Sequence, residues 1–283
     1  MTPPVVVKFG GELIEDASRL GTAVAAIAVA AATTPLVIVH GGGREIDAAL
    51  KRAGLETRQV DGLRMTDEAT LDVVVAVLAG TVNTRFVAAL NTAGVPAVGL
   101  TGVDAKCGLS QQAPAHRGVD GRTVDLGRVG VPTDRSDVRL LTTLLGDGFV
   151  PVVASIGIGA DGQLFNVNAD TLAGHLAARL GARRLAIAGT TPGVLDGNGQ
   201  TVPLLESGAI ARMVTSGTAT AGMIAKLRAC ERALAGGVGD VLIVDGRDGS
   251  AIEAAAAGGV PAASTRLMGS ERSAALSGPR PRG

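Results

Sequence analysis

The chain has 283 residues, of which 46% are hydrophobic, and its formal net charge at pH 7 is zero. It has no Trp or Tyr and only four Phe, so its core must be built from Val, Ile, Leu and Ala, and its 41 glycines suit an α/β protein with many tight turns. Zero net charge without a run of Lys and Arg argues against nucleic acid or an anionic membrane as a partner.

The remaining composition points to the cytoplasm. The two cysteines, Cys107 and Cys230, lie far apart, which argues against a disulfide framework or a zinc site and fits a reducing compartment. The N-terminus has no charged leader followed by an apolar stretch, so we expect no signal peptide. The longest apolar-rich segment, residues 23–32, is alanine-dominated and too short to span a bilayer.

Short apolar runs alternate with amphipathic stretches along the chain. The runs are β-branched and bounded by Gly or Pro, and they predict buried strands at residues 5–9, 36–39, 95–100, 150–155, 184–188 and 240–244. The amphipathic stretches predict helices at residues 45–53, 67–93 (one long or broken helix), 136–146, 169–180, 205–214 and 223–235. This alternation predicts a mostly parallel sheet covered by helices on both faces.

Residues 101–133 break this rhythm, since they are rich in Gly, Asp and Arg, and they predict hairpins or a lid-like excursion. Residues 269–283 consist largely of Ser, Gly, Pro and Arg and predict a disordered tail. A boundary near residues 175–182 would divide the rest into two α/β halves, 1–178 and 179–268, with a cleft between them.

Two glycine turns follow the first two predicted strands. The first strand ends in Lys8-Phe-Gly-Gly and the second in His40-Gly-Gly-Gly, which leads directly into a helix. Ligands of α/β sheets bind at the carboxyl ends of strands, where glycines let backbone N–H groups approach an anion. Either turn alone is most simply a tight turn, but two of them, one opened by a lysine, favour an anion site.

The common nucleotide motifs do not account for these turns. No lysine follows a glycine, so the chain has no Walker-type phosphate loop. Gly157-Ile-Gly-Ala-Asp-Gly matches the dinucleotide pattern, but the residues after it alternate as a strand does, whereas the fingerprint requires a helix. We interpret this match as a hairpin turn.

The few lysines are informative because arginine is the general cation of this chain. There are 22 arginines and four lysines, at Lys8, Lys51, Lys106 and Lys226. A compact ammonium is suited to contact a phosphoryl oxygen. Lys226 could be an ordinary exposed helix residue, but Lys8 ends an apolar strand, and a charge there requires a partner.

Two further polar segments are candidates for a binding site. Asn166-Val-Asn-Ala-Asp opens a helix, and its Asn168 is a plausible N-cap with Asp170 in the first turn. Arg64 precedes another helix and could bind a carboxylate with its two-pronged guanidinium, although an isolated loop arginine is more often solvated.

Taken together, these segments resemble the amino acid kinase family, and within it the branch that phosphorylates acetylglutamate. The resemblance extends from residue 5 to about residue 268 and consists of nine segments in the same order. They are Lys8-x-Gly-Gly, His40-Gly-Gly-Gly, Gly62-Leu-Arg-Met-Thr-Asp, Leu78-Ala-Gly-Thr-Val-Asn, Val98-Gly-Leu-Thr-Gly, Asp125-Leu-Gly-Arg-Val-Gly, Asn166-Val-Asn-Ala-Asp, Gly222-Met-Ile-Ala-Lys and Val244-Asp-Gly-Arg.

The resemblance implies a three-layer α/β/α sandwich with a mostly parallel central sheet, whose N-terminal half binds the amino acid and whose C-terminal half binds ATP. It implies transfer of the ATP γ-phosphate to the side-chain carboxylate of N-acetyl-L-glutamate in arginine biosynthesis. Lys8 and Lys226 would contact the transferring phosphoryl group, and Asp170 would hold the two lysines in place.

The resemblance also implies the binding residues. Gly10, Gly11 and Gly43 would offer backbone N–H groups to phosphate. The acetylamino acid would be held by Gly42, Gly43, Arg64 and Asn166. The nucleotide would be bordered by Thr190, Thr191, Pro192, Gly193, Val194, Leu195, Thr218, Ala219 and Thr220.

The implied chemistry needs few groups. A carboxylate is ionised at pH 7 and is itself the nucleophile, so no general base is required. Positioning and neutralisation of phosphoryl charge remain, and two lysines, glycine amides and Mg²⁺ would supply them. The chain shows no dedicated carboxylate cage, so we expect no protein metal site and Mg²⁺ carried on the ATP phosphates.

The chain departs from the family pattern at three places. Gly189-Thr-Thr-Pro-Gly-Val lacks the usual acid at Thr190, Ala221 replaces Gly or Asp, and Asp248-Gly-Ser-Ala replaces a His-rich helix start. The first strand begins at once, whereas arginine-inhibited hexameric relatives carry an extra N-terminal helix. We therefore expect an arginine-insensitive homodimer.

Two alternatives remain open at this stage. One is a related acyl-phosphate-forming kinase that acts on aminoadipate or a carrier-linked amino acid. The other is an inactive amino-acid or nucleotide sensor with the same fold. The Thr190 departure favours the sensor, whereas the intact Lys8, Asp170 and Lys226 argue against it.

Overall fold

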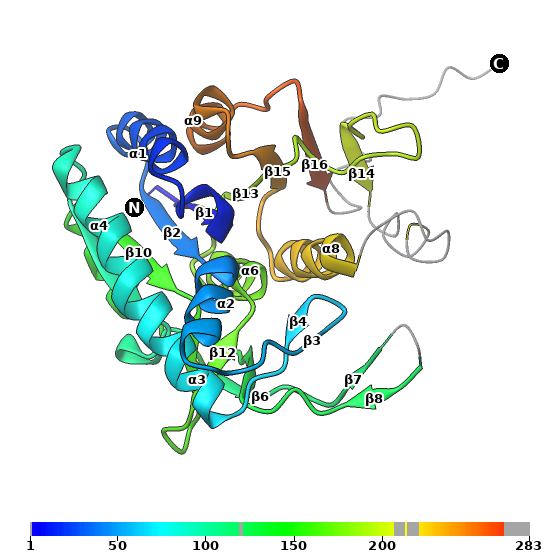
Figure 1. Ribbon diagram of the computed structural model, residues 1–283. Helices are drawn as coiled ribbons and strands as arrows, with labels where there is room; N and C mark the ends of the chain where they lie inside the picture. Colours follow the sequence, from blue (N-terminus) through cyan, green and yellow to red (C-terminus); the bar gives the residue numbers. More distant parts are fainter. Residues whose placement is uncertain (1, 119–120, 207–212, 214–220, 269–283) are drawn as a thin grey trace.

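The computed structural model describes residues 2–118, 121–206, 213 and 221–268. A large central sheet lies between two layers of helices (Figure 1). Its eight strands, in spatial order, are β14 (Leu204–Glu206), β16 (Ser264–Met268), β15 (Val241–Asp245), β13 (Arg184–Gly189), β1 (Val5–Phe9), β2 (Leu36–His40), β10 (Val150–Ala154) and β5 (Ala97–Thr101). The six strands from β15 to β5 are parallel to one another, and β16 pairs antiparallel to β15. The predicted α/β sandwich with a mostly parallel sheet is confirmed.

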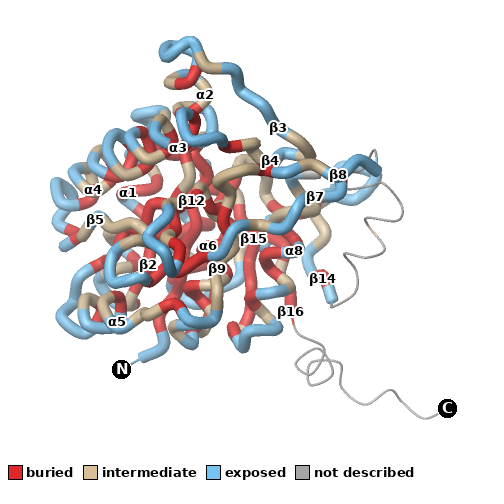
Figure 2. Tube along the Cα trace, turned by 90° about the horizontal axis from the view of Figure 1, so that it is seen from below, coloured by how far each residue is buried: buried red, intermediate tan, exposed pale blue. Residues whose placement is uncertain are grey.

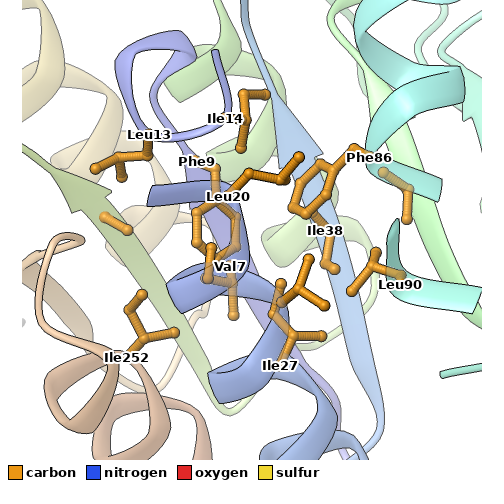
Figure 3. Packing of buried hydrophobic residues seen from close by; sticks show 14 of the residues in the cluster. Val7, Phe9, Leu13, Ile14, Leu20, Ile27, Ile38, Phe86, Leu90 and Ile252 are labelled. Carbon is orange, nitrogen blue, oxygen red and sulfur yellow. The ribbon is translucent and has the colours of Figure 1, made fainter. Parts of the chain in front are cut away.

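The two faces of β1 lie in two separate hydrophobic cores. Val5, Val7 and Phe9 pack with α1 (Ala17–Ala31), α4 (Asn83–Thr92) and α9 (Gly249–Ala257). Val6 packs on the other face with α5 (Arg139–Gly146), α6 (Ala169–Arg179) and α8 (Ala221–Ala235). Figure 3 shows the first core, in which aliphatic side chains surround Phe9 and Phe86. Because side chains alternate along a strand, Lys8 must project on the same side as Val6, toward α6 and α8.

Smaller strands form the excursions at one edge of the molecule. A four-stranded sheet contains β6 (Ser110–Gln112), β9 (Val129–Pro132), β11 (Ile156–Ile158) and β12 (Leu164–Val167), and two separate hairpins pair β3 (Gln59–Val60) with β4 (Leu63–Arg64) and β7 (His116–Arg117) with β8 (Thr123–Val124). Figure 2 shows β7 and β8 in the colours of exposed and intermediate residues, in contrast to the buried central sheet. The predicted hairpins within residues 101–133 and at the Gly157 turn are confirmed, the latter by antiparallel pairing of β11 with β12.

All six predicted strands are present, with bounds shifted by no more than two residues. The predicted helices correspond to α2 (Gly43–Arg52), the continuous helical run Glu68–Thr92, α5, α6 and α8. That run consists of α3 (Glu68–Val75), a π-helical segment (Ala76–Val82) and α4. Strand β16 and helices α1 and α9 were not among the predicted elements.

One predicted helix is wrong at its start. Residues 205 and 206 of the expected helix 205–214 belong to strand β14, whose Leu205 is buried against the second core. Pairing with β16 outweighs the local helical pattern there. Residues 207–212 and 214, and the tail 269–283, lie outside the described part of the chain.

The most apolar long segment is also different from the one expected. The run Glu68–Thr92, and not the segment 23–32, has the length and composition of a membrane-spanning helix, and its mean hydropathy is 1.8. Its Val74, Leu78, Val82, Phe86 and Leu90 are buried in the first core. One face of this run therefore packs against the central sheet.

Candidate functional site

Lys8 lies at the carboxyl end of β1 and forms a buried ion pair. Its Nζ is 2.9 Å from Oδ1 of Asp170, and each side chain is only 11% exposed. The strand alternation described above directs Lys8 toward the face that α6 covers. The sequence prediction that this lysine requires a buried partner is confirmed.

Asp170 occupies the first turn of α6. Asn168 is the N-cap of this helix, because its side chain accepts a hydrogen bond from the Thr171 N–H at 3.0 Å. The positive end of the helix dipole favours a carboxylate at this position. Burial alone would raise the pKa of the Asp170 carboxyl, but the ammonium groups of Lys8 and Lys226 outweigh burial and hold this pKa below its ordinary value.

Lys226 approaches the same carboxylate from α8. A Cβ added to Gly189, the last residue of β13, would lie 3.2 Å from the Lys226 Nζ, which places this ammonium over the end of the strand next to β1. Burial lowers the pKa of Lys226, the charge of Asp170 opposes this shift, and the charge of Lys8 adds to it. The structure therefore brings together Lys8, Asp170 and Lys226, which are separated widely in the sequence.

The two glycine turns touch each other backbone to backbone beside these charges. A Cβ on Gly11 would lie 2.7 Å from the Gly42 Cα, so no side chain fits at position 11. A Cβ on Gly10 would lie 2.5 Å from the Glu12 carboxylate. Gly43 begins α2, so its N–H lies at the positive end of a helix. This arrangement presents backbone donors and two ammonium groups to one anionic ligand.

A cavity of about 330 Å³ opens next to the turns, and it is lined by Gly42, Gly43, Arg64 and Asn166, among others. All four predicted substrate-binding residues therefore share one pocket. Its size fits a small organic molecule. Glu12 also lines the cavity, and its carboxylate raises the pKa of Lys226 slightly, a role that the sequence pattern did not indicate.

The side chain of Arg64 is largely covered, and one of its nitrogens has no partner in the protein. Its Nη2 lies 2.6 Å from Asp47 Oδ1 and donates to the Gly43 carbonyl at 3.2 Å, and its side chain is 9% exposed. Its Nη1 is buried and has no hydrogen-bond partner in the protein. A buried unpaired guanidinium N–H is costly, so a carboxylate ligand in this pocket would satisfy it. The expectation that a loop arginine is more often solvated does not apply to Arg64.

Asn166 lies across the pocket on β12. Its Nδ2 donates to Thr66 Oγ1 at 3.1 Å, which fixes the orientation of the side chain. The short strand β12 pairs with β9 on one side and with β11 on the other. The pocket is thus lined partly by these edge strands and partly by the glycine turn 41–43 that follows β2, whereas Lys8, Asp170 and Lys226 lie outside its lining.

The predicted nucleotide segment follows β13. Thr190, Thr191 and Pro192 are partly exposed and Leu195 is 36% exposed, whereas Gly193 and Val194 are buried. Val194 donates its N–H to Thr265 Oγ1 at 2.8 Å, and a Cβ on Gly193 would lie 2.9 Å from the Thr265 N atom. Thr218, Ala219 and Thr220 lie outside the described residues.

The chain is similar to known proteins over most of its length. The amino acid kinase family model matches residues 3–245. The acetylglutamate kinase of Acidiphilium cryptum is 42% identical over 250 residues, which cover 86% of this chain and 83% of that protein. That of Granulibacter bethesdensis is 41% identical over 252 residues, with the same coverage of both chains.

Solved structures show the same architecture. The crystal structure of smu.665 from Streptococcus mutans superposes with a TM-score of 0.77 and 26% identity, covering 95% of this chain and 99% of that chain. N-acetylglutamate synthase from Neisseria gonorrhoeae, complexed with coenzyme A and N-acetylglutamate, has a TM-score of 0.77 and 25% identity, covering 94% of this chain and 59% of that one.

The histidine at the end of β2 generates a prediction about acid stability. Burial lowers the pKa of His40 to about 4, although its bond to the Gly41 carbonyl opposes the shift, and burial also lowers the pKa of His175 to about 4. Unfolded histidine titrates near 6.5, so between about pH 6.5 and pH 4 the unfolded chain binds protons that the folded chain does not. The free energy of unfolding should fall as the pH is lowered through this window, by about 1.4 kcal/mol per pH unit for His40 alone.

Urea unfolding at several pH values between 7 and 4 measures this dependence. The slope should be shallower in His40→Asn and in His175→Asn than in the wild type, because each variant removes one of the two titrating groups. A free energy of unfolding that stays constant from pH 6.5 to pH 4.5 would contradict the assignment of both histidines as neutral in the folded chain.

Proposed function

The chain belongs to the amino acid kinase family, and from this premise we propose that the Lys8–Asp170–Lys226 site transfers the γ-phosphate of ATP to a carboxylate held in the neighbouring pocket. The enzyme is a phosphotransferase of arginine biosynthesis. It phosphorylates the side-chain carboxylate of N-acetyl-L-glutamate and forms an acyl phosphate. The observation that carries the catalytic assignment is the buried Lys8–Asp170 ion pair with Lys226 beside it.

The chemistry follows from charge and position. The acceptor carboxylate is ionised near neutral pH and attacks the γ-phosphorus directly, so the site needs no general base. As the bond to the β–γ bridging oxygen breaks, the ammonium groups of Lys8 and Lys226 stabilise the negative charge on the phosphoryl oxygens. Asp170 keeps both ammonium groups in place. Backbone N–H groups of Gly11 and Gly43 add donors to the phosphate. The predicted donor Gly10 is already engaged, because its N–H is donated to the Ala188 carbonyl at 3.2 Å.

The pocket residues hold the rest of the acceptor. The unpaired Nη1 of Arg64 binds the α-carboxylate of acetylglutamate, because this nitrogen is buried and lacks a partner. Gly42, Gly43 and Asn166 complete the binding site. These contacts fix the position of the side-chain carboxylate relative to the lysines, and such positioning supplies much of the rate enhancement in group transfer.

ATP binds the C-terminal half in this proposal. Residues 190–195 border the nucleotide together with Thr218, Ala219 and Thr220, and residues 1–178 and 179–268 form the two ligand-binding halves. The partly exposed Thr190, Thr191 and Pro192 support this assignment. Gly193 and Val194 support it indirectly, because their contacts with Thr265 hold the segment in place.

Mg²⁺ enters the site on the nucleotide. The described residues contain no group of three or more His, Cys, Asp or Glu side chains that could ligate a metal ion. Asp170 is engaged by lysine, so it is unsuited to a metal. Mg²⁺ bound to the ATP phosphates would neutralise part of their charge.

The functional unit in this proposal is a cytoplasmic homodimer. Strand β5 ends the eight-stranded sheet at one edge, and an open edge strand is a ready site of pairing between two chains. We expect light scattering to give the mass of a dimer and arginine to leave the activity unchanged. A hexamer, or inhibition by arginine, would contradict this part of the proposal.

The substrate is tested by trapping the acyl phosphate as a hydroxamate. We expect ATP-dependent hydroxamate with acetylglutamate, and much less with glutamate, aspartate or aminoadipate. Product with aminoadipate instead of acetylglutamate would preserve the chemistry and change the substrate. ATP binding without product from any of these acids would support an inactive sensor.

The catalytic lysines are tested by substitution. Lys8→Ala and Lys226→Ala should each lower kcat by about a hundredfold or more, because each removes a donor that stabilises charge in the transition state. Lys51→Ala is the matched control, since Lys51 is exposed near the end of α2 and should leave kcat unchanged. Near-normal turnover in either catalytic variant would show that the phosphoryl site is misassigned.

A further inference from the structure

The last residue of β2, His40, is fully buried directly before the glycine turn that lines the pocket. Its imidazole has two polar neighbours. Nδ1 lies 3.0 Å from the carbonyl oxygen of Gly41, and Nε2 lies 3.0 Å from Nδ2 of Asn83. Neither His40 nor Asn83 has a role in the phosphoryl transfer described above.

Asn83 determines which nitrogen of His40 carries the proton. Its Nδ2 lies 2.9 Å from the Val152 carbonyl oxygen and 3.4 Å from the Leu100 carbonyl oxygen. Carbonyl oxygens only accept, so the group that faces them is the NH₂ and not the amide oxygen. An NH₂ group has two hydrogens and accepts none, so its two short contacts take them: one is donated to the Val152 carbonyl at 2.9 Å and the other to Nε2 of His40 at 3.0 Å, and the Leu100 carbonyl is only a weak contact. Nε2 of His40 therefore accepts and carries no proton. The ring proton therefore lies on Nδ1 and is donated to Gly41.

The bond from His40 to Gly41 decides the direction of the next backbone N–H. In a planar trans peptide the C=O and the N–H point in opposite directions, and the described chain has no cis peptide bond. The Gly41 carbonyl turns toward the buried ring of His40. The N–H of Gly42 belongs to the same peptide unit and is therefore turned away from the ring.

The helical run that carries Asn83 also packs against Gly42. A Cβ on Gly42 would lie 2.9 Å from Leu78 Cδ2 and 3.3 Å from Val82 Cγ2. Leu78 and Val82 belong to the π-helical segment Ala76–Val82, and Asn83 follows it directly. Segments of π-helix are frequent at functional sites because the wider turn redirects side chains.

Two further neighbours hold the pair in place. The ring of Phe86 packs edge-on against His40 with a centroid distance of 6.3 Å. On β5, a Cβ added to Gly99 would collide with the Asn83 Oδ1, so a glycine is required there to make room for the amide. The glycine in the Val98-Gly-Leu segment is thus explained by the space that the Asn83 side chain needs.

We propose that His40 and Asn83 are positioning residues that aim the Gly42 N–H at the carboxylate substrate. His40 acts as the neutral Nδ1–H tautomer, and Asn83 enforces that tautomer. The proposal rests on the proposed function only for the identity of the substrate. Loss of the Nδ1 donor would free the Gly41–Gly42 peptide to rotate and would weaken binding of the acceptor, whereas ATP contacts other residues.

Two substitutions distinguish the role of the Nδ1–H donor from the role of the imidazole ring. His40→Asn keeps an N–H donor near the position of Nδ1, whereas His40→Gln places its donor one carbon further out. We expect His40→Gln to raise the KM for acetylglutamate about tenfold, the effect of losing one hydrogen bond to a charged group, and to change the KM for ATP less than about twofold. His40→Asn should recover most of that loss.

A matched control is His175→Asn on α6, which removes a partly buried histidine whose Nε2 lies 2.9 Å from Ser136 Oγ. Both KM values should stay unchanged in this control, even if its melting temperature falls. An unchanged KM for acetylglutamate in His40→Gln, equal increases in both KM values, or no recovery in His40→Asn would overturn the proposal.

The tautomer can be measured without any variant and without substrate. The chain has three histidines, so ¹⁵N NMR of the wild-type side chains can resolve the signals of His40. We expect a protonated Nδ1 and an unprotonated Nε2 at neutral pH. A protonated Nε2 would overturn the proposal even if acetylglutamate is the substrate, whereas an inactive wild type with the expected tautomer would overturn the proposed function alone.

Discussion

The ion pair between Lys8 and Asp170 is the interaction on which the rest of the site depends. Two ammonium groups beside each other in a buried site repel, and two unit charges about 4 Å apart interact by about 4 kcal/mol at an effective dielectric constant of 20. A carboxylate in contact with Lys8 and near Lys226 offsets this repulsion, and its charge opposes the lowering of the Lys226 pKa by burial. The negative charge of the same carboxylate is also stabilised by the positive end of the α6 helix dipole. The carboxylate therefore holds two positive charges close together, where both can face a phosphoryl group.

The fold brings these three groups together by simple rules. Parallel pairing aligns the ends of β1, β2 and β13, so Lys8 and both glycine turns meet at one edge. Alternation along β1 turns Lys8 toward α6 and α8, which carry Asp170 and Lys226. The opposite face carries the core of Phe9 and the long helical run, whose π-helical segment presses on Gly42 and whose Asn83 contacts His40. One face of the sheet thus carries the helices with Asp170 and Lys226, and the helices on the other face support the glycine turn that lines the pocket.

Much of this arrangement could be predicted from the sequence. The buried strands, the glycine turns and the need of Lys8 for a partner follow from local patterns, and the family resemblance brought Asp170 and Lys226 into the same site. The burial of Arg64 could not be predicted, because it depends on Asp47 and on the pocket walls formed by distant segments. The same holds for the pair of His40 and Asn83, which lie 43 residues apart and meet only after the long helix has packed on the sheet. The local pattern predicts a helix at residues 205–206 in place of the end of strand β14, because the pairing of β14 with β16 cannot be seen in a local window.

The most direct test of the account is the pKa of the Lys226 ammonium, measured by NMR in the wild type and in Asp170→Asn. The chain has only four lysines, so the signals can be assigned by substitution. The account predicts a wild-type pKa below the ordinary lysine value and a still lower pKa in Asp170→Asn, because the variant loses the charge that opposes burial. The same pKa in both proteins would show that Asp170 does not hold the second lysine in its charged form, and it would contradict the assignment of these three residues to one catalytic unit.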